Sequence, residues 1–453
     1  MAVSHAQLKG RTEALRLISQ SLARIWGAIF GGICAFLTVF AHAYYGYPVY
    51  GYLGMPYTPL GIEHYMMLLV LAGIPGFFLK QRATKPGDFA VSVIYFFCYI
   101  PAISLGTCSG LLVGEAYAAH ILCLFIGFCT LQYLAQMPVS SFRRPHIRPA
   151  AFICIVLFFY FWFLAWIVAE NYSTMRLAGF FTVYDQRSVG GQAIGTSGYA
   201  LGMLAGAVNP LLMSYGLFGK RRFLLFLGIV GQFVCFSVAA NKIMIFAVIY
   251  IPVMYFLVGR RAGHLSHKFP PIVWMGPAYM FLLLVGLGFA TIYFQTLSIN
   301  ADAFASQLLM RLILLPGSVT TQYAVFFQTN PLTYMTHVGF GRFIADSPYA
   351  QEVSLVLGAY LADQDRGMNA NVNFFAYDGI ASFGPIGMIV MGFIVGATLS
   401  IANRLVRRDM LHVVLVSMSA LSFQMAEGSY FSAMLTYGGG LLFALFFLMP
   451  YDE

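Results

Sequence analysis

The chain has 453 residues, of which 60% are hydrophobic and only 9% are Asp, Glu, Lys or Arg. A water-soluble domain carries roughly a quarter charged residues, so this chain has too few charges to cover a surface in water. The composition therefore excludes a soluble globular enzyme and predicts an all-α integral membrane protein. The seven cysteines lie in or beside apolar runs without zinc spacing, which excludes a disulfide framework and a cysteine metal site.

Apolar runs of about 20 residues, the length that a helix needs to cross a bilayer, recur along the chain. We expect about twelve such spans, at residues 25–44, 61–79, 88–106, 116–137, 149–170, 197–217, 222–240, 241–258, 271–293, 379–401, 410–427 and 429–449. The long connection between the ninth and tenth spans contains two short apolar runs, 304–315 and 354–361, that are typical of amphipathic helices. The sequence thus predicts a transmembrane bundle over 1–293, a helical cap over 294–378 and three further spans over 379–453.

The basic residues predict the orientation, because Lys and Arg are concentrated in cytoplasmic loops. If the N-terminus is cytoplasmic, the N-terminal segment and every even-numbered connection are basic, and both chain ends lie inside. The net charge of +9 is then mainly a topology signal, with some attraction to anionic membrane lipids, and gives little weight to a nucleic-acid partner. The long connections at 171–196 and 294–378 face outward in this arrangement.

Six basic residues remain on the predicted outer side. They are Arg176, Arg187, Lys242, Arg311, Arg342 and Arg366. Arg suits phosphate because its planar fork donates paired hydrogen bonds and keeps its charge. Arg187 opens a glycine-rich run ending at Gly198, where backbone amides can approach an anion closely. Arg311 lies in an apolar run and needs a counter-anion, either a headgroup, Asp302 or the phosphates of a lipid-linked substrate. The alternative is that these side chains only reach lipid headgroups or pair with nearby acids.

A polar and aromatic patch closes the long outer connection. The residues expected to hold sugar, through hydrogen bonds and ring faces, are Asn369, Asn371, Asn373, Tyr377 and Asp378. The alternative is a re-entrant turn in which the Asn side chains cap backbone groups. His337 is the candidate general base, because imidazole titrates near neutral pH. The competing carboxylate bases are Glu352, Asp363, Asp365 and Asp378.

These residues resemble those of bacterial O-antigen polymerases, also called oligosaccharide repeat-unit polymerases. The segments that carry the resemblance are Lys85-Pro86, Asn241-Lys242, Arg311 through Pro316-Gly317, and Asn369 through Gly387 with its motif Asp-Gly-x-Ala-x-Phe-Gly-x-x-Gly. Arg187 and Gly198 also match the Arg-x10-Gly spacing found in the family's large outer loops. The second long loop departs from the pattern, because none of its arginines is followed by glycine at that spacing.

The resemblance implies a GT-C-like glycosyltransferase of lipopolysaccharide biosynthesis, in the bacterial inner membrane with its active site facing the periplasm. It would transfer a glycan from undecaprenyl diphosphate to the hydroxyl of another lipid-linked unit. Arg187, Arg311 and the remaining outer cations would neutralise the departing diphosphate, and His337 would accept the proton of the acceptor. Neither a cofactor nor a metal is expected, and a chain-length regulator protein is an expected partner beside the membrane lipids.

Three alternatives stay open. An O-antigen ligase uses the same donor and transfers the glycan to lipid A-core. A flippase or small-solute transporter would need ionisable residues at mid-bilayer and two comparable halves, whereas the expected spans are nearly free of charge. The third alternative is a non-enzymatic subunit of a polysaccharide assembly complex.

Overall fold

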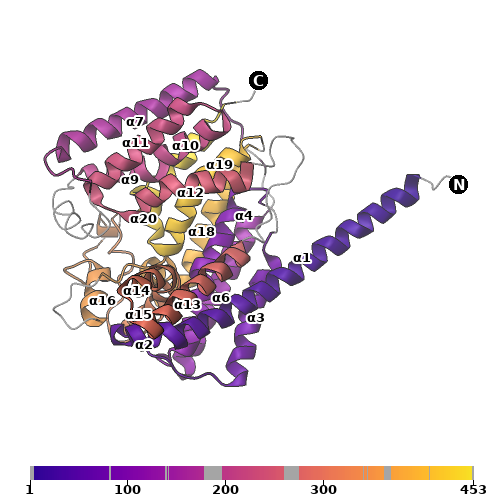
Figure 1. Ribbon diagram of the computed structural model, residues 1–453, viewed down its shortest axis with the longest axis vertical. Helices are drawn as coiled ribbons and strands as arrows, with labels where there is room; N and C mark the ends of the chain where they lie inside the picture. Colours follow the sequence, from indigo (N-terminus) through magenta and orange to yellow (C-terminus); the bar gives the residue numbers. More distant parts are fainter. Residues whose placement is uncertain are drawn as a thin grey trace. The chain divides into compact units, whose positions relative to one another are not determined.

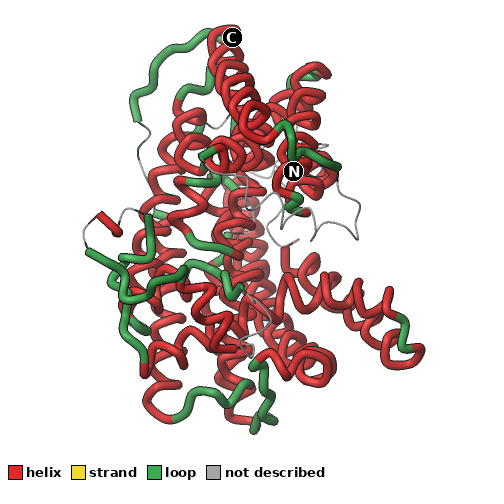
Figure 2. The backbone as a smooth tube through the Cα atoms, turned by 90° about the vertical axis from the view of Figure 1, so that its left-hand side faces the viewer, coloured by secondary structure: helices red, strands yellow, loops and turns green. Residues whose placement is uncertain are grey.

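The structure, a computed structural model, describes residues 5–80, 83–137, 140, 142–177, 196–259, 275–339, 341–343, 345–361, 369–407 and 409–450. Every regular element within these ranges is a helix, and no strand occurs in them (Figure 2). The prediction of an all-helical membrane protein is confirmed for this part of the chain.

The α-helices follow one another as labelled in Figure 1. They are α1 His5–Ala41, α2 Tyr47–Tyr50, α3 Ile62–Phe78, α4 Pro86–Ile94, α5 Ile100–Cys108, α6 Gly114–Gln136, α7 Pro149–Asn171, α9 Ser197–Met203, α10 Asn209–Phe218, α11 Arg222–Ala239, α12 Lys242–Gly259, α13 Met275–Thr296, α14 Ile299–Ala305, α15 Leu315–Thr329, α16 Val353–Leu361, α17 Ala381–Phe383, α18 Ile386–Leu405, α19 Leu411–Glu427, α20 Tyr430–Leu435 and α21 Gly439–Phe447. Two short 3₁₀ turns lie at Gly51–Leu53 and Gly341–Phe343.

Among the described residues, nine helices are long and apolar enough to cross a membrane. They are Arg24–Leu53, Pro86–Cys108, Gly114–Gln136, Pro149–Asn171, Ser197–Phe218, Arg222–Ala239, Met275–Thr296, Ile299–Thr329 and Ile386–Leu405. Three shorter apolar helices, Ile62–Phe78, Met244–Val258 and Leu411–Glu427, coincide with further expected spans. The chain is therefore a multi-pass helical membrane protein by length and composition, while the number of twelve spans stays a prediction.

Two regions differ from the sequence-based expectation. The run expected as a short helix at 304–315 is part of a continuous helix of 31 residues, Ile299–Thr329. This helix contains Pro316, and the wider π-helical turn before it lets the chain pass a residue that has no N–H to donate. The expected last span at 429–449 is instead two short helices, α20 and α21, because Gly438 adopts a left-handed φ of 78° between them. The other expected cap helix is present as α16.

The described chain contains five π-helical segments, a conformation that occupies well under 1% of residues in ordinary globular proteins. They are η1 His42–Gly46, η3 Tyr95–Tyr99, η4 Leu204–Val208, η6 Ser306–Leu314 and η8 Phe375–Ile380. The segment η6 contacts both η1 and η3, and η8 packs against α15. Since π-helical turns often occur at functional sites, the surroundings of the Ile299–Thr329 helix are the first region to consider.

The chain divides into two compact units. The first unit comprises Met1–Arg82, Val91–Gln132 and Pro271–Phe393, and the second comprises Ala83–Ala90, Tyr133–Pro270 and Ile394–Glu453. The predicted cap, 294–378, therefore belongs to the same unit as α1, α3 and α13. Its proposed place at the outer membrane surface stays a prediction.

Buried aromatic residues form the core of the first unit. The rings of Tyr99 and Phe128 stack with centroids 4.5 Å apart. The Tyr95 hydroxyl donates to the carbonyl of Ala72, and the Tyr99 hydroxyl donates to the carbonyl of Leu71 at 2.9 Å. These two hydrogen bonds attach η3 to α3. They hold the buried helix Pro86–Cys108, which contains η3, inside the unit.

Glycine allows the closest helix contacts in each unit, as is common in membrane bundles. In the first unit, α1 and α3 lie side by side (Figure 1), and a Cβ at Gly76 would lie 2.6 Å from the carbonyl oxygen of Gly27. In the second unit, a Cβ at Gly228 of α11 would lie 2.9 Å from the carbonyl oxygen of Asn209 on α10.

Candidate functional site

Asn373 joins the start of η8 to α15. Its Nδ2 donates to Oγ1 of Thr320 at 2.8 Å and to the carbonyl of Pro316 at 3.5 Å, and its Oδ1 accepts from the backbone N–H of Ala376 at 3.3 Å. The side chain is fully buried, with 0% exposure. These contacts fit the capping alternative rather than direct sugar contact, because both polar atoms of Asn373 already bind protein groups.

Asn369 and Asn371 lie just before this buried amide and are exposed, whereas the alternating residues Ala370 and Val372 are buried. Oδ1 of Asn369 accepts from the backbone N–H of Asn371 at 2.9 Å. The Ala370 N–H donates to the carbonyl of Ser354 at 2.9 Å and so holds the segment against α16. Two of the three predicted amides are therefore exposed, whereas the third, Asn373, is buried.

Tyr377 connects η8 to the start of α16. Its hydroxyl donates to Oε1 of Glu352 at 3.2 Å. Glu352 is exposed, while Tyr377 and Asp378 are buried. The buried ring of Tyr323, on α15, lies edge-on to Tyr377 with centroids 6.4 Å apart. The cluster thus contains one buried and one exposed carboxylate around two phenols.

His337 lies beneath the same turn, with 6% exposure. Its Nε2 is 2.9 Å from the carbonyl of Tyr377, so this nitrogen donates, and its Nδ1 is 2.7 Å from Oγ1 of Thr333. Thr333 in turn donates its backbone N–H to the carbonyl of Ala381 at 2.8 Å, and its hydroxyl oxygen lies 2.9 Å from the same carbonyl. Both ring nitrogens of His337 are therefore engaged in tying the 333–337 turn to η8, and proton transfer at His337 would require one of these bonds to open.

Tyr349 anchors the loop between His337 and α16. Its hydroxyl donates to the carbonyl of Pro331 at 2.7 Å, and its ring lies 6.1 Å from that of Phe326 and 6.2 Å from that of Phe327. Burial raises the pKa of the Tyr349 phenol above its ordinary value, so the hydroxyl stays a neutral donor at physiological pH.

Arg311 is exposed on the π-helical turn η6, five residues before Pro316 on the same continuous helix. Asp302, considered as its counter-ion, accepts a hydrogen bond from the Tyr45 hydroxyl at 2.7 Å. That bond fixes η1 to the start of the Ile299–Thr329 helix. The structure therefore gathers Asn373, Tyr377, Asp378 and His337 beside α15, while Arg311 precedes α15 on the same continuous helix.

The other predicted cations are distributed differently. Arg176 is exposed in the second unit, where its backbone N–H donates to the carbonyl of Ser237 at 3.0 Å. Lys242 begins α12 in the same unit, and Arg342 lies in the 3₁₀ turn of the first unit; the side chains of both lie outside the description. Arg187, Arg366, Asp363 and Asp365 lie outside the described residues.

The glycines of the Asp-Gly-x-Ala-x-Phe-Gly-x-x-Gly motif have structural roles. Gly384 ends α17 with φ 63° and ψ −154°, a combination that is essentially restricted to glycine. A Cβ at Gly387 would collide with the carbonyl oxygen of Gly379, so these two residues allow the start of α18 to touch η8. The motif therefore shapes the turn that carries Tyr377 and Asp378.

A further buried polar pair, His120 on α6 and Thr321 on α15, lies beside Gly106 of α5 and was not among the predicted site residues. His120 and Thr321 are fully buried, and both ring nitrogens of His120 and Oγ1 of Thr321 have no hydrogen-bond partner. His120 Nε2 and Thr321 Oγ1 each lie 3.5 Å from the position of a Cβ at Gly106. The signal in the sequence is that His120 is an ionisable residue inside an apolar run.

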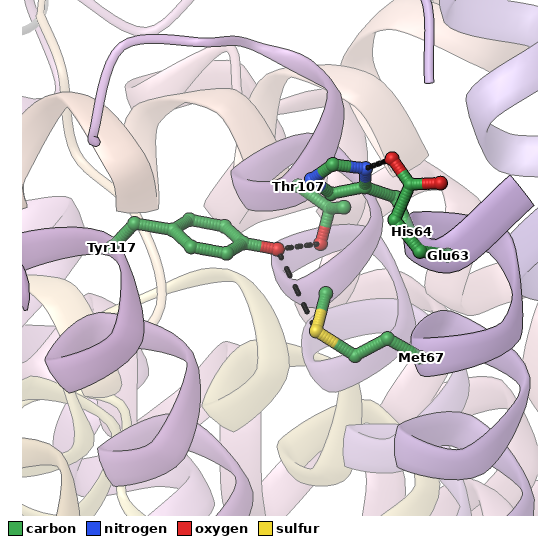
Figure 3. Close-up of polar contacts among 5 residues, drawn as sticks. All are labelled: Glu63, His64, Met67, Thr107 and Tyr117. Atoms are coloured by element: carbon green, nitrogen blue, oxygen red, sulfur yellow. Dashed lines mark hydrogen bonds and ion pairs between the residues drawn. The ribbon is translucent and has the colours of Figure 1, made fainter. Parts of the chain in front are cut away.

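A second polar contact lies nearby between α3, α5 and α6 (Figure 3). The Tyr117 hydroxyl lies 3.3 Å from Oγ1 of Thr107 and 3.9 Å from the sulfur of Met67. Nδ1 of His64 lies 3.1 Å from Oε1 of Glu63, which is exposed, while His64 is half-buried. This surface contact contains one acid and one imidazole, which is too few to form a metal site.

Within the described residues, no group of three or more His, Cys, Asp or Glu side chains is arranged to hold a metal ion. No family model matches the chain, and no curated protein or solved structure is similar enough to indicate a relative. The candidate site therefore depends on its own geometry and on the residues that carry the sequence resemblance.

Proposed function

We propose that this protein is a membrane glycosyltransferase that extends lipid-linked glycans, an oligosaccharide repeat-unit polymerase of the bacterial inner membrane. One observation carries the proposal. The two largest segments of the resemblance, Arg311 through Gly317 and Asn369 through Gly387, are joined in space by the bonds from Asn373 to Pro316 and Thr320. Segments more than 50 residues apart that meet at a rare π-helical turn fit one shared site better than two unrelated structural features.

The donor would be a glycan linked to undecaprenyl diphosphate. In the transfer, the bond between the anomeric carbon and the diphosphate oxygen breaks, and a new bond forms to the acceptor oxygen, which loses its proton. Arg311 would bind the diphosphate as its negative charge increases, because a guanidinium pairs with two phosphate oxygens at once. Its exposed position on an apolar helix suits a phosphate that belongs to a membrane lipid.

Glu352 is the better candidate for the general base. It is exposed and oriented by the Tyr377 hydroxyl, whereas both nitrogens of His337 already bind protein groups. In this scheme His337 is a positioning residue that holds η8. The exposed amides of Asn369 and Asn371 would bind hydroxyls of the glycan beside Glu352.

The remaining elements of the proposal follow from the resemblance. The site would face the periplasm, a chain-length regulator protein would act with the polymerase, and the reaction would use neither a nucleotide nor a metal. Arg342 and Arg366, which belong to the same unit as Arg311, would contribute further positive charge to the diphosphate site.

The test is reconstitution of the full chain in liposomes with undecaprenyl diphosphate-linked repeat units and a chelator, without nucleotide. We expect a ladder of longer lipid-linked glycans on a gel. General acid–base catalysis contributes about 10²- to 10⁴-fold, so Glu352→Gln should slow extension by that factor. Glu115→Gln, a change at another exposed glutamate of the first unit, is the matched control and should extend normally.

Three outcomes would contradict parts of the proposal. Extension by Glu352→Gln at the wild-type rate would remove Glu352 as the base. Transfer only when lipid A-core is supplied would identify a ligase. Movement of labelled units across the bilayer without bond formation would identify a transporter instead of a glycosyltransferase.

A further inference from the structure

Asn403 joins three helix ends in the second unit. Its Oδ1 accepts from the backbone N–H of Gly87, at the start of α4, at 2.8 Å. Its Nδ2 donates to the carbonyl of Ala135, near the end of α6, at 2.7 Å. A Cβ at Gly87 would lie 2.9 Å from Nδ2 of Asn403, so glycine is needed for this approach. The buried amide thereby holds the last turns of α6 and α18 beside the first turn of α4.

Basic side chains surround this junction. Nζ of Lys85 donates to the carbonyl of Met137 at 3.1 Å, and Nη2 of Arg144 donates to the carbonyl of Arg404 at 3.0 Å. Both carbonyls belong to helix C-terminal ends, where the helix dipole is negative and favours cations. The guanidinium of Arg404 lies 5.6 Å from the ring centroid of Phe142. Three cations are therefore held in place near one another by helix ends and an aromatic ring.

The nearby carboxylates are already engaged. Oδ2 of Asp88 accepts from the N–H and the hydroxyl of Thr84 and from the N–H of Lys85, at 3.0, 2.8 and 3.1 Å. Asp409 forms an ion pair with Arg407. Within the described residues, neither Nζ of Lys85 nor the guanidinium of Arg404 lies within ion-pair distance of a carboxylate.

The guanidinium of Arg404 also retains hydrogen-bonding capacity, since its Nε is buried without a hydrogen-bond partner. An unpaired buried guanidinium nitrogen is costly, and an anion would satisfy it. The junction thus has an excess of positive charge with an unsatisfied donor.

Exposed apolar side chains lie on the two helices, α18 and α6, that end at this junction. Ile401, 49% exposed, precedes Arg404 by three residues and lies on the same face of α18. Tyr133, 66% exposed, precedes Met137 by four residues on α6. A phospholipid has a negatively charged phosphate next to apolar acyl chains. The cations of the junction would face the phosphate, and the exposed apolar side chains would face the acyl chains.

We propose that Lys85 and Arg404 bind the phosphate of an anionic phospholipid headgroup, with Arg144 adding positive charge and the acyl chains lying along Ile401 and Tyr133. Arg404 supplies the fork that pairs with phosphate oxygens, and Lys85 supplies a point charge. Free phosphate shares this chemistry but lacks the chains. The site is independent of the proposed glycosyl transfer, because it uses none of the residues around α15.

The experiment measures binding of fluorescent phosphatidylglycerol to the full chain in detergent, with phosphatidylcholine carrying the same label as the neutral comparison. Each Lys or Arg near a membrane surface contributes about 1 kcal/mol, so Arg404→Gln and Lys85→Gln should each weaken phosphatidylglycerol binding about fivefold. Arg148→Gln removes an exposed charge of the same unit outside the junction and should change binding less than twofold. Arg404→Lys, which keeps the positive charge, should bind phosphatidylglycerol more tightly than Arg404→Gln does. This partial rescue would show that substitution of Arg404 leaves the fold intact.

Each result decides a different point. Preference for phosphatidylglycerol that is lost in both junction variants supports the lipid site. If the two lipids bind equally, and millimolar inorganic phosphate displaces a phosphate probe from the protein, the junction binds a free anion. This result would overturn the proposed lipid site. Unchanged phosphatidylglycerol binding in Arg404→Gln and Lys85→Gln would overturn the site itself.

Discussion

Replacement of Gly384 by alanine isolates the backbone strain that shapes the proposed site. Gly384 has φ 63° and ψ −154°, and an added Cβ would meet nothing within 4 Å. Steric contact therefore contributes no penalty, and the whole effect comes from the backbone conformation. Residues held in this glycine-only region cost about 1–3 kcal/mol, which is the expected loss in the free energy of unfolding. The change would also loosen η8, because the Gly384 N–H donates to the carbonyl of Ile380 at 2.9 Å.

Gly288→Ala is the matched control. Gly288 lies inside α13, and a Cβ there also meets nothing within 4 Å. Alanine in a helix interior is favoured over glycine by about 1 kcal/mol, so this variant should be at least as stable as the parent protein. The free energies of unfolding of the Gly384→Ala and Gly288→Ala variants should thus differ by roughly 2–4 kcal/mol.

Thermal unfolding in detergent, followed with a thiol-reactive fluorophore, measures both variants. Four cysteines are buried and react when the fold opens; they are Cys34, Cys98, Cys108 and Cys235. We expect Gly384→Ala to unfold several degrees below the parent and Gly288→Ala at or above it. Equal unfolding temperatures for Gly384→Ala and the parent would refute the left-handed turn and, with it, the described start of α18.

The remaining predictions use the same unfolding assay. Asn373→Ala leaves buried groups unpaired and should cost about 1–3 kcal/mol, whereas Asn371→Ala, at an exposed position, should stay within about 0.5 kcal/mol; equal effects would contradict the capping role. Asn403→Ala removes two hydrogen bonds between helix ends and should lower the free energy of unfolding by about 2 kcal/mol. An unchanged unfolding temperature would refute the role of Asn403 in joining these helix ends. Gly106→Ala should cost about 1–3 kcal/mol, because its methyl would lie 3.3 Å from the buried Cδ1 of Ile121, which is closer than ordinary van der Waals contact; an unfolding temperature equal to that of the parent would show that Ile121 can give way.

Some features follow from the sequence because their causes are local. Hydropathy over about 20 residues predicts membrane helices, and nine of the described helices meet this criterion. The helix expected at 354–361 is present as α16. The polar segment from Asn369 to Asp378 also stood out in the sequence, because polar residues are rare in this chain. The placement of Lys and Arg predicts the orientation of the helices in the membrane, and this orientation stays a prediction.

The arrangement of the site was decided by tertiary packing. Apolar periodicity does not reveal a π-helical turn, since one extra residue in a turn leaves the composition unchanged. The sequence accordingly predicts only a short helix at 304–315, which in the structure is part of the continuous helix Ile299–Thr329.

The side-chain roles depended on partners distant in the chain. Asn373 is a structural amide because Thr320, 53 residues away, accepts its hydrogen bond, and His337 is engaged at both nitrogens because the Tyr377 carbonyl, 40 residues away, faces it. Glu352 is a candidate base only through its bond to the Tyr377 hydroxyl. A sequence states which side chains can donate and accept hydrogen bonds, but helix packing determines which partners they meet and which of them remain exposed to a ligand.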